Sequence, residues 1–180
     1  TPLMLDKIVT AMDGMYEQMA KESASDIAGD VYEYLLSKLE NAGRNGQFRT
    51  PRQIIKMMVE LVKPRPDDVI CDPAFGSAGF LIAAATYLKE NCKQEVFFDR
   101  KNKDHYMNHM FHGFDMDRTM LRIGAMNMML HGVDNPFIEY RDSLSDQNPD
   151  KDKYSLILAN PPFKGSLDYD IVSTDLLKLC

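Results

Sequence analysis

Short apolar runs alternate with helical patterns between residues 68 and 159, and this alternation constrains the possible fold more than any other feature. The runs with the length and composition of strands are 68–71, 110–114, 137–140 and 154–159. Residues with helical spacing follow over 80–88 and 119–130. Strands that alternate with helices predict an α/β fold with a mostly parallel sheet covered on both faces.

The residues before the first strand have helical periodicity. Apolar side chains recur at helical spacing over 3–19 and 26–39, which predicts two N-terminal helices. A polar, glycine-containing turn over 41–46 ends this part. We therefore predict a helical segment over 1–43 and a second domain over 44–180.

A further helix precedes the first strand. Thr50 and Pro51 are typical of an N-cap and a first helical position, and the helix is expected to end before Lys63. A polar stretch over 89–109 interrupts the strand and helix alternation, and we interpret it as a solvated insertion.

Charge and composition exclude several classes of protein. With 44% hydrophobic and 27% charged residues the chain is typical of an ordinary soluble domain. The formal charge of -6 argues against binding nucleic acid by bulk electrostatics, so any DNA contact is expected to be local or shared with a partner. No apolar run predicts a membrane span or a signal peptide.

Cysteine usage indicates a reducing compartment. Cys71, Cys92 and Cys180 are too few and too scattered for a disulfide scaffold, which favours the cytoplasm. A start at Thr1 and an end soon after an irregular stretch lead us to expect part of a longer protein.

The segment after the first strand, 72–80, contains two glycines and leads into a helix. Ligands of open parallel sheets bind beyond the carboxyl ends of the strands, where glycines allow close approach and a helix offers free N–H groups. The spacing matches neither a Walker A loop nor G-x-G-x-x-G, so phosphate is not favoured. Asp72 suits a cationic ligand such as an ammonium or sulfonium group. The alternative is a plain strand-to-helix turn.

Acidic residues follow the second and third strands. Asp115 and Asp117 are placed to accept hydrogen bonds from ribose hydroxyls, which together with the first loop predicts an adenosine-like ligand. An acidic turn that caps the helix near Thr119 is the alternative. Asp142, after the third strand, leaves the same two possibilities open.

The most specific motif directly follows the fourth strand: Asn160, Pro161, Pro162 and Phe163. Two prolines stiffen the backbone and remove N–H donors, so the Asn160 side-chain oxygen and the Pro161 carbonyl can both accept from an amino group. Such hydrogen bonds favour attack by an amine whose lone pair is delocalised into an aromatic ring. Phe163 can stack on a base rotated out of a duplex. The alternative is a β-turn that ends a strand.

The order of the segments 47–52, 72–80 and 160–163 resembles that of the adenine-specific amino-group DNA methyltransferases that use S-adenosylmethionine. Within that family the chain is most similar to the methylation subunit of type I restriction-modification enzymes, on residues 30–36 and 126–132. The resemblance implies a Rossmann-like S-adenosylmethionine-dependent methyltransferase, C-terminally truncated and preceded by helices.

The resemblance also implies roles for individual residues. Asp72 would face the methionine end of the cofactor and Asp142 its adenine. The implied cofactor contacts are Gln47, Phe48, Arg49, Thr50, Pro51, Arg52, Asp72, Pro73, Gly76, Ser77, Ala78, Gly79, Asp115 and Asp142. Asn160, Pro161, Pro162 and Phe163 would hold the target adenine. The implied partners are double-stranded DNA, a specificity subunit and an ATP-dependent restriction subunit.

Other functions compete with this interpretation. A solitary or nuclease-fused adenine methyltransferase, a methyltransferase of protein glutamine and a non-catalytic assembly module would share part of the pattern. His105, His109 and His112 suggest zinc, but no cysteine lies near them, and we expect no metal. The 13 methionines are interpreted as adaptable core residues.

Overall fold

The computed structural model describes residues 50–161 together with Gly29, Val31, Tyr32 and Tyr34. The chain divides into two compact units, Thr1–Asn45 and Gly46–Cys180. The four described positions of the first unit are helical and fall within the helix predicted over 26–39. The helix predicted over 3–19 lies outside the described residues. The assignment of 1–43 and 44–180 as separate domains stays a prediction.

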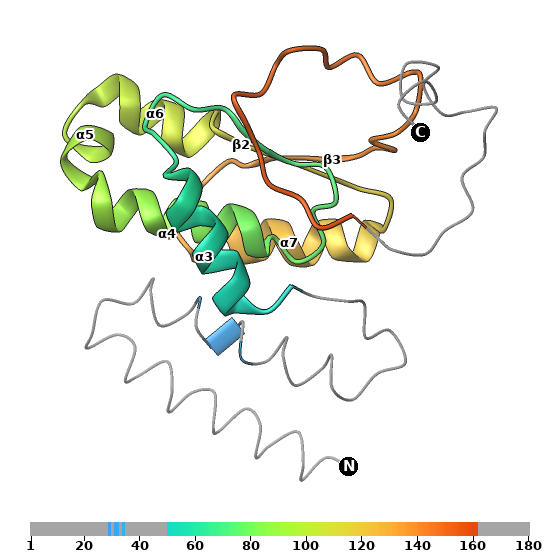
Figure 1. Ribbon diagram of the computed structural model, residues 1–180, viewed down its shortest axis with the longest axis horizontal. Coiled ribbons are helices and arrows are strands. Elements are labelled where there is room, and N and C mark those ends of the chain that lie inside the picture. Colours follow the sequence, from blue (N-terminus) through green and yellow to red (C-terminus); the bar gives the residue numbers. More distant parts are fainter. Residues whose placement is uncertain (1–28, 30, 33, 35–49, 162–180) are drawn as a thin grey trace, which may run out of the picture. The chain divides into compact units, whose positions relative to one another are not determined.

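In the described part of the second unit, parallel strands form one sheet with the order β3-β2-β1-β4 (Figure 1). The strands are β1 Ile70–Asp72, β2 Phe111–Asp115, β3 Phe137–Tyr140 and β4 Leu156–Ile157. β1 is central, because Ile70 pairs with Phe111 on one side and with Leu156 on the other. Each strand overlaps its predicted run, so the α/β fold with a parallel sheet is confirmed.

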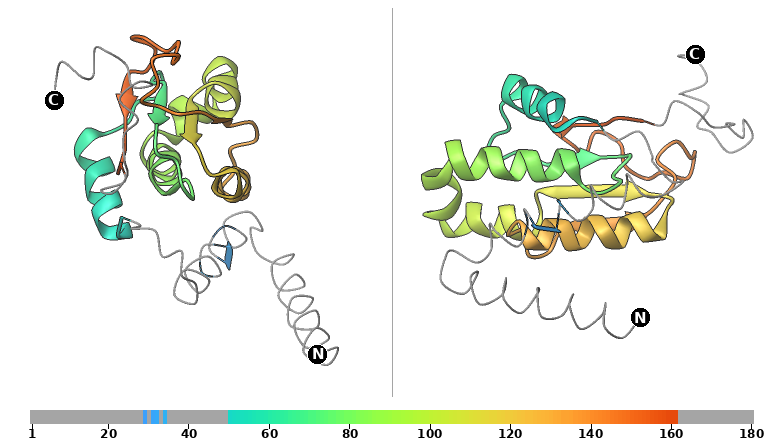
Figure 2. Two further views of the ribbon diagram at one scale, coloured as in Figure 1. Left: turned by 90° about the vertical axis from the view of Figure 1, so that its right-hand side faces the viewer. Right: turned by 90° about the horizontal axis from the view of Figure 1, so that it is seen from below.

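Three helices lie on one side of this sheet (Figures 1 and 2): α3 Arg52–Val62, α4 Gly79–Asn91 and α7 Arg118–Leu130. Their apolar faces and the inward residues of the strands form a core that includes Ile55, Leu81 and Phe111. Burial of this apolar surface is the main driving force for the arrangement. None of the helices in the described residues has both the length and the apolar character needed to cross a bilayer.

The other face of the sheet is covered by the chain that follows β3. His112 and Phe114 alternate along β2 with residues that face the helices, so they point to this second face. The ring centroid of His112 lies 5.1 Å from that of Phe137 and 5.2 Å from that of Tyr154. The segment between β3 and β4 therefore covers this second face of the sheet, as a parallel sheet requires.

The interpretation of 89–109 as a solvated insertion holds for most of its side chains, which are exposed, but it missed two helices and their buried anchors. This stretch forms α5 Lys93–Phe97 and α6 Arg100–Asn108. Val96 and Tyr106 are fully buried, and the Tyr106 ring packs edge-on against Phe111 at 5.3 Å between centroids. Two apolar anchors in a charged sequence are enough to dock both helices, but they are too sparse to produce a periodic pattern.

Two smaller predictions also need correction. Thr50 is not the N-cap of α3: Pro51 occupies that position, and no side chain caps the helix. The interpretation of the methionines as core residues holds only for some of them. Among the methionines that the structure describes, Met110 and Met128 are buried, whereas Met57, Met116, Met126 and Met129 are exposed.

Candidate active site

The carboxyl ends of the strands bring the predicted segments to one edge of the sheet. Asp72 is the last residue of β1 and Asp115 the last of β2. Asp142 follows the end of β3, and Asn160 follows β4. Because the strands are parallel, their carboxyl ends lie at the same edge. Four segments from distant parts of the sequence therefore surround one candidate site.

The glycine loop, residues 72–79, is attached to the end of β2 by its backbone. The Phe75 N–H donates to the Phe114 carbonyl at 2.9 Å, and the Gly76 N–H donates to Asp115 Oδ2 at 2.8 Å. Gly76 and Ala78 have positive φ angles of 52° and 71°. Glycine adopts such an angle without steric cost, which explains its place at the tightest part of the loop.

A buried aromatic ring anchors this loop, and sequence reasoning missed it. Phe75 is 2% exposed, and its ring occupies a slot between Gly113 of β2 and Gly124 of α7. A Cβ atom at either glycine would come within 2.3 Å of the ring, closer than any real contact. The two glycines lie outside every predicted motif, and only the folded structure brings them together around Phe75.

The Asp72 side chain is an acid removed from water. It is 2% exposed, and its Oδ1 accepts a hydrogen bond of 3.0 Å from the Ala74 N–H. Burial raises the pKa of Asp72 to about 7; the Ala74 hydrogen bond opposes this rise and the neighbouring charge of Asp115 adds to it. A cation at this place would favour the ionised carboxylate. The site therefore suits a positively charged ligand better than an anionic one.

The start of α4 is held by helices on both of its sides. The Asn127 side-chain amide of α7 donates to the Ser77 carbonyl at 2.9 Å. A Cβ at Gly79 would lie 3.1 Å from Ile55 Cδ1 of α3, so α3 packs closely where α4 begins. Asn127 is completely buried and its role was not identified from the sequence. These contacts fix the free N–H groups at the start of α4 relative to the loop.

The acidic turn after β2 caps a helix, which was one of the two alternatives that the sequence left open, and it also binds the glycine loop. Asp115 accepts from Gly76 with one oxygen and from the Asp117 N–H, at 2.8 Å, with the other. Asp117 caps α7, since its Oδ1 accepts from the Thr119 N–H at 2.7 Å. Asp117 is thus the helix cap, and Asp115 connects the turn to the glycine loop. Each Asp115 oxygen has a second lone pair for a ligand, and the ribose contact stays a prediction.

The turn after β3 is fixed to the same loop. Ser143 Oγ donates to the Pro73 carbonyl at 2.7 Å, and the Leu144 N–H donates to Asp142 Oδ1 at 2.9 Å. Asp142 is half-buried. The structure therefore brings Pro73 and the Asp142 turn together, and their contact with a cofactor stays a prediction.

Asn160 is brought to this edge by the pairing of β4 with β1. The Leu158 N–H donates to the Cys71 carbonyl at 2.9 Å, and the Leu158 side chain is buried. Asn160 is half-buried and Pro161 is exposed. Pro162 and Phe163 lie outside the described residues. The same holds for Gln47, Phe48 and Arg49 at the other predicted segment, where Pro51 and Arg52 are exposed.

The three histidines that suggested zinc have separate partners. His105 Nε2 lies 2.8 Å from the Asp68 carbonyl, and His112 Nε2 lies 3.0 Å from the His109 carbonyl. His109 Nε2 is 3.5 Å from the Asp104 carboxylate. Among the described residues, no group of three or more His, Cys, Asp or Glu side chains is arranged to hold a metal ion.

Comparison with known proteins identifies relatives over most of the chain. The type I restriction enzyme StySJI methylase subunit of Salmonella typhimurium is 32% identical over 182 residues, which cover 96% of this chain and 34% of that subunit. The EcoKI methylase subunit of Escherichia coli K12 is 31% identical over 181 residues, with the same two coverages of 96% and 34%. The chain thus spans about a third of the length of these relatives.

Solved structures agree with these relatives. The crystal structure of the EcoKI M protein has a TM-score of 0.64 and 30% identity, covering 73% of this chain and 28% of that chain. A chain from a structure of a type I R-M system has a TM-score of 0.67 and 32% identity, covering 84% of this chain and 32% of that one. The model of the N-6 DNA Methylase family matches residues 23–177. The chain belongs to the N-6 DNA Methylase family.

Proposed function

We propose that this chain binds S-adenosylmethionine and provides catalytic residues for methyl transfer to the exocyclic amino group of adenine in DNA. It would do so as part of the modification subunit of a type I restriction-modification system, as its relatives are named. The observation that supports this function most strongly is the buried Asp72 carboxylate beside the glycine loop, at the sheet edge to which β4 brings Asn160.

The residues of this edge fit the cofactor by their chemistry. S-adenosylmethionine supplies a methyl group on a cationic sulfonium, and it also carries an ammonium group. The ionisation of Asp72, which burial disfavours, becomes favourable beside such a cation. Among described neighbours of Gly76, an added Cβ would meet only the Ala74 carbonyl oxygen, at 3.9 Å, so the loop backbone is open to a ligand.

The target base would be held by the motif after β4. Asn160 Oδ1 and the Pro161 carbonyl can accept hydrogen bonds from the two protons of the adenine amino group. These hydrogen bonds draw the nitrogen towards tetrahedral geometry and expose its lone pair to the methyl group. Pro162 would stiffen the backbone, and Phe163 would stack on the flipped base. The chain's own residues thereby position the two reactants for direct displacement.

The net charge of the chain and the names of its relatives support a proposal about its partners. Since the chain has a formal charge of -6, we infer that recognition of double-stranded DNA depends on a separate specificity subunit. An ATP-dependent restriction subunit would complete the system. We infer a cytoplasmic location, where DNA and S-adenosylmethionine are both available.

The direct test is transfer of labelled methyl groups from S-adenosylmethionine to duplex DNA. The assay uses these residues within a full-length methylase subunit, with and without a specificity subunit, and identifies the modified base by mass spectrometry. We expect N6-methyladenine, loss of product in Asn160→Ala, and full activity in Asn91→Ala at the exposed end of α4. Methylation of protein glutamine would contradict the proposal, and adenine methylation without a specificity subunit would favour a solitary enzyme.

A further inference from the structure

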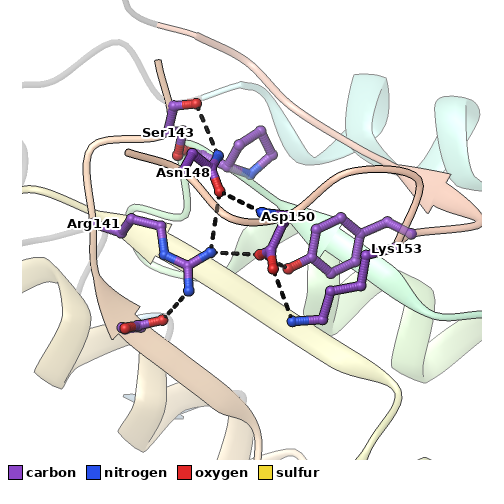
Figure 3. A network of polar contacts seen from close by, with 8 residues as sticks. Arg141, Ser143, Asn148, Asp150 and Lys153 are labelled. Atoms are coloured by element: carbon purple, nitrogen blue, oxygen red, sulfur yellow. Dashed lines mark hydrogen bonds and ion pairs between the residues drawn. The ribbon is translucent and has the colours of Figure 1, made fainter. Parts of the chain in front are cut away.

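A network of charged and polar side chains covers the second face of the sheet. It belongs to the polar segment, defined as residues 141–154, and is centred on the Asp150 carboxylate (Figure 3). Asp150 accepts from Arg141 Nη1 and from the Tyr154 hydroxyl, each at 2.5 Å, and from Lys153 Nζ at 3.1 Å. Its side chain is 9% exposed. Hydrogen bonds between its own side chains, rather than regular secondary structure, therefore hold the polar segment together.

Arg141 connects this network to the sheet. Its backbone N–H donates to the Asp115 carbonyl at 3.2 Å, which extends the pairing of β3 with β2 by one residue. Its guanidinium carbon lies 4.2 Å from the centroid of the Phe114 ring, and Nη2 donates to the Glu139 carboxylate. The side chain is 16% exposed. Arg141 is thus held by its backbone bond to β2, by the Phe114 ring and by the carboxylates of Glu139 and Asp150.

The network continues from Arg141 to the glycine loop. Arg141 Nη1 lies 3.4 Å from Asn148 Oδ1, and the Asn148 amide donates to the Ser143 carbonyl at 3.2 Å (Figure 3). Ser143 in turn donates to the Pro73 carbonyl. Asp142, the predicted contact to the cofactor adenine, lies between Arg141 and Ser143 and is held at both ends.

We propose that Arg141 is a positioning residue that fixes the Asp142–Ser143 turn against the glycine loop and so sets the affinity of the cofactor site. It acts through Asp142 and Ser143. This inference rests on the proposed function for its effect on S-adenosylmethionine, while its effect on the turn follows from the contacts alone.

The chemistry of the site requires arginine and excludes lysine. The planar guanidinium donates from two different nitrogens to Asp150, Asn148 and Glu139 while its face lies over Phe114. A lysine ammonium is a single point charge on a flexible stem and cannot occupy these positions together. Arg141→Lys therefore keeps the positive charge but removes the pair of donor nitrogens. The variant distinguishes an effect of positioning from an effect of charge alone.

The test compares variants that remove different hydrogen bonds of the same network. Arg141→Lys and Asn148→Ala interrupt the route to Ser143 in two independent ways. Tyr154→Phe is the matched control, because it removes one hydrogen bond to Asp150 and keeps the ring packed against His112. For each variant, amide hydrogen exchange over 73–79 and 142–148 is measured without ligand, and S-adenosylmethionine affinity is measured by calorimetry.

We expect both disrupting variants to speed exchange of the Leu144 and Gly76 amides by about tenfold and to weaken the cofactor by a similar factor. Tyr154→Phe should change the exchange rates and the cofactor affinity by less than about twofold. This holds even if its unfolding midpoint falls as far as those of the two disrupting variants. Equal effects in all three variants, or unchanged exchange in Arg141→Lys and Asn148→Ala, would overturn the positioning role. Failure of the unaltered chain to bind S-adenosylmethionine would contradict the proposed function instead, and the exchange data would still decide the role of Arg141.

Discussion

The glycine loop lies where the strands end, and the polar segment begins at that edge and covers the second face of the sheet, but different forces hold them. The glycine loop is fixed from below, by the fully buried ring of Phe75 and by backbone hydrogen bonds to β2. The polar segment is fixed from its own side chains, through Arg141, Asn148 and Asp150. Apart from Asp72, the loop therefore depends on packing volume, whereas the segment depends on charge and hydrogen-bond geometry.

This difference indicates how the two regions respond to change. A packed ring has little room to adjust, so one added methyl group in its slot strongly lowers the free energy of unfolding. A network of half-buried polar groups tolerates the loss of one member at lower cost, but it depends on pH. Among steric substitutions, those in the glycine loop should therefore destabilise the protein most. Changes of pH should have opposite effects on the stability that Asp72 and Asp150 contribute.

The largest expected effect comes from the pH dependence of Asp72. Burial raises its pKa to about 7, so the folded protein keeps this proton over a range in which the unfolded chain has lost it. The stability contributed by the protonated carboxyl is therefore present below about pH 4 and is lost as pH rises to 7. Relative to Asp72→Asn, the unaltered protein should lose up to about 4 kcal/mol over that interval.

Urea unfolding of both proteins at several values between pH 4 and 7.5 measures this difference. The difference between the two proteins reports the ionisation of Asp72 together with its coupling to Asp115. A constant difference across the range would mean that Asp72 ionises normally, and the contrast with Asp150 would disappear.

A methyl group in the Phe75 slot should have the next largest effect. Gly124→Ala places a Cβ 2.3 Å from the Phe75 ring and 2.9 Å from the Gly76 carbonyl oxygen. We expect a loss of about 3 kcal/mol in the free energy of unfolding, partly recovered when Phe75→Leu is added. Gly79→Ala is the matched control within the loop, because its Cβ would meet only the flexible end of Ile55, among described neighbours. Equal losses at both glycines would contradict the packing account.

Asp150→Asn tests the polar segment, where the stabilisation is lost as pH falls rather than as pH rises. Burial raises the pKa of Asp150, but hydrogen bonds from Tyr154, Lys153 and Arg141 outweigh it and lower the pKa to about 2. The stabilisation is thus present above about pH 4 and is lost as pH falls towards 2. We expect a cost of roughly 2 kcal/mol at pH 7 that vanishes at low pH. Asp146→Asn, exposed on the same segment, should have no measurable effect.

The smallest effect is expected at a helix cap outside both regions. Asp117→Ala removes the acceptor of the Thr119 and Met120 N–H groups, which should cost about 1 kcal/mol. Thermal unfolding compared with Asp134→Ala, at an exposed position after α7, measures this cost. A loss as large as that of Gly124→Ala would show that α7 depends on its cap more than on the packing of Phe75.

Local sequence features predicted the sheet and the positions of the candidate site residues. The strands after Pro66, the glycine loop, and the acidic residues after β2 and β3 could be identified because their signals lie within a few adjacent residues. Asp72 and Asp115 were recognised on these grounds. Their burial, and the Asp115 hydrogen bond to Gly76, could not be read from composition or spacing.

The remaining features depend on residues far apart in the chain. Phe75 meets Gly113 and Gly124 only in the folded protein, and Arg141 meets Asp150 through a loop without periodicity. The helices α5 and α6 were missed because only a few of their positions are buried. A helix that docks through single anchors leaves no amphipathic pattern for sequence reasoning to detect.

The central claim, that the buried Asp72 receives a cationic cofactor, is tested most directly by proton-linked calorimetry. S-adenosylmethionine is titrated into the chain between pH 5.5 and 7, where an α-amino group remains protonated. If Asp72 faces the cation, binding releases a proton and the affinity falls by up to about tenfold for each pH unit below 7, and Asp72→Asn abolishes both effects. Binding without proton release and with constant affinity over this range would contradict the account.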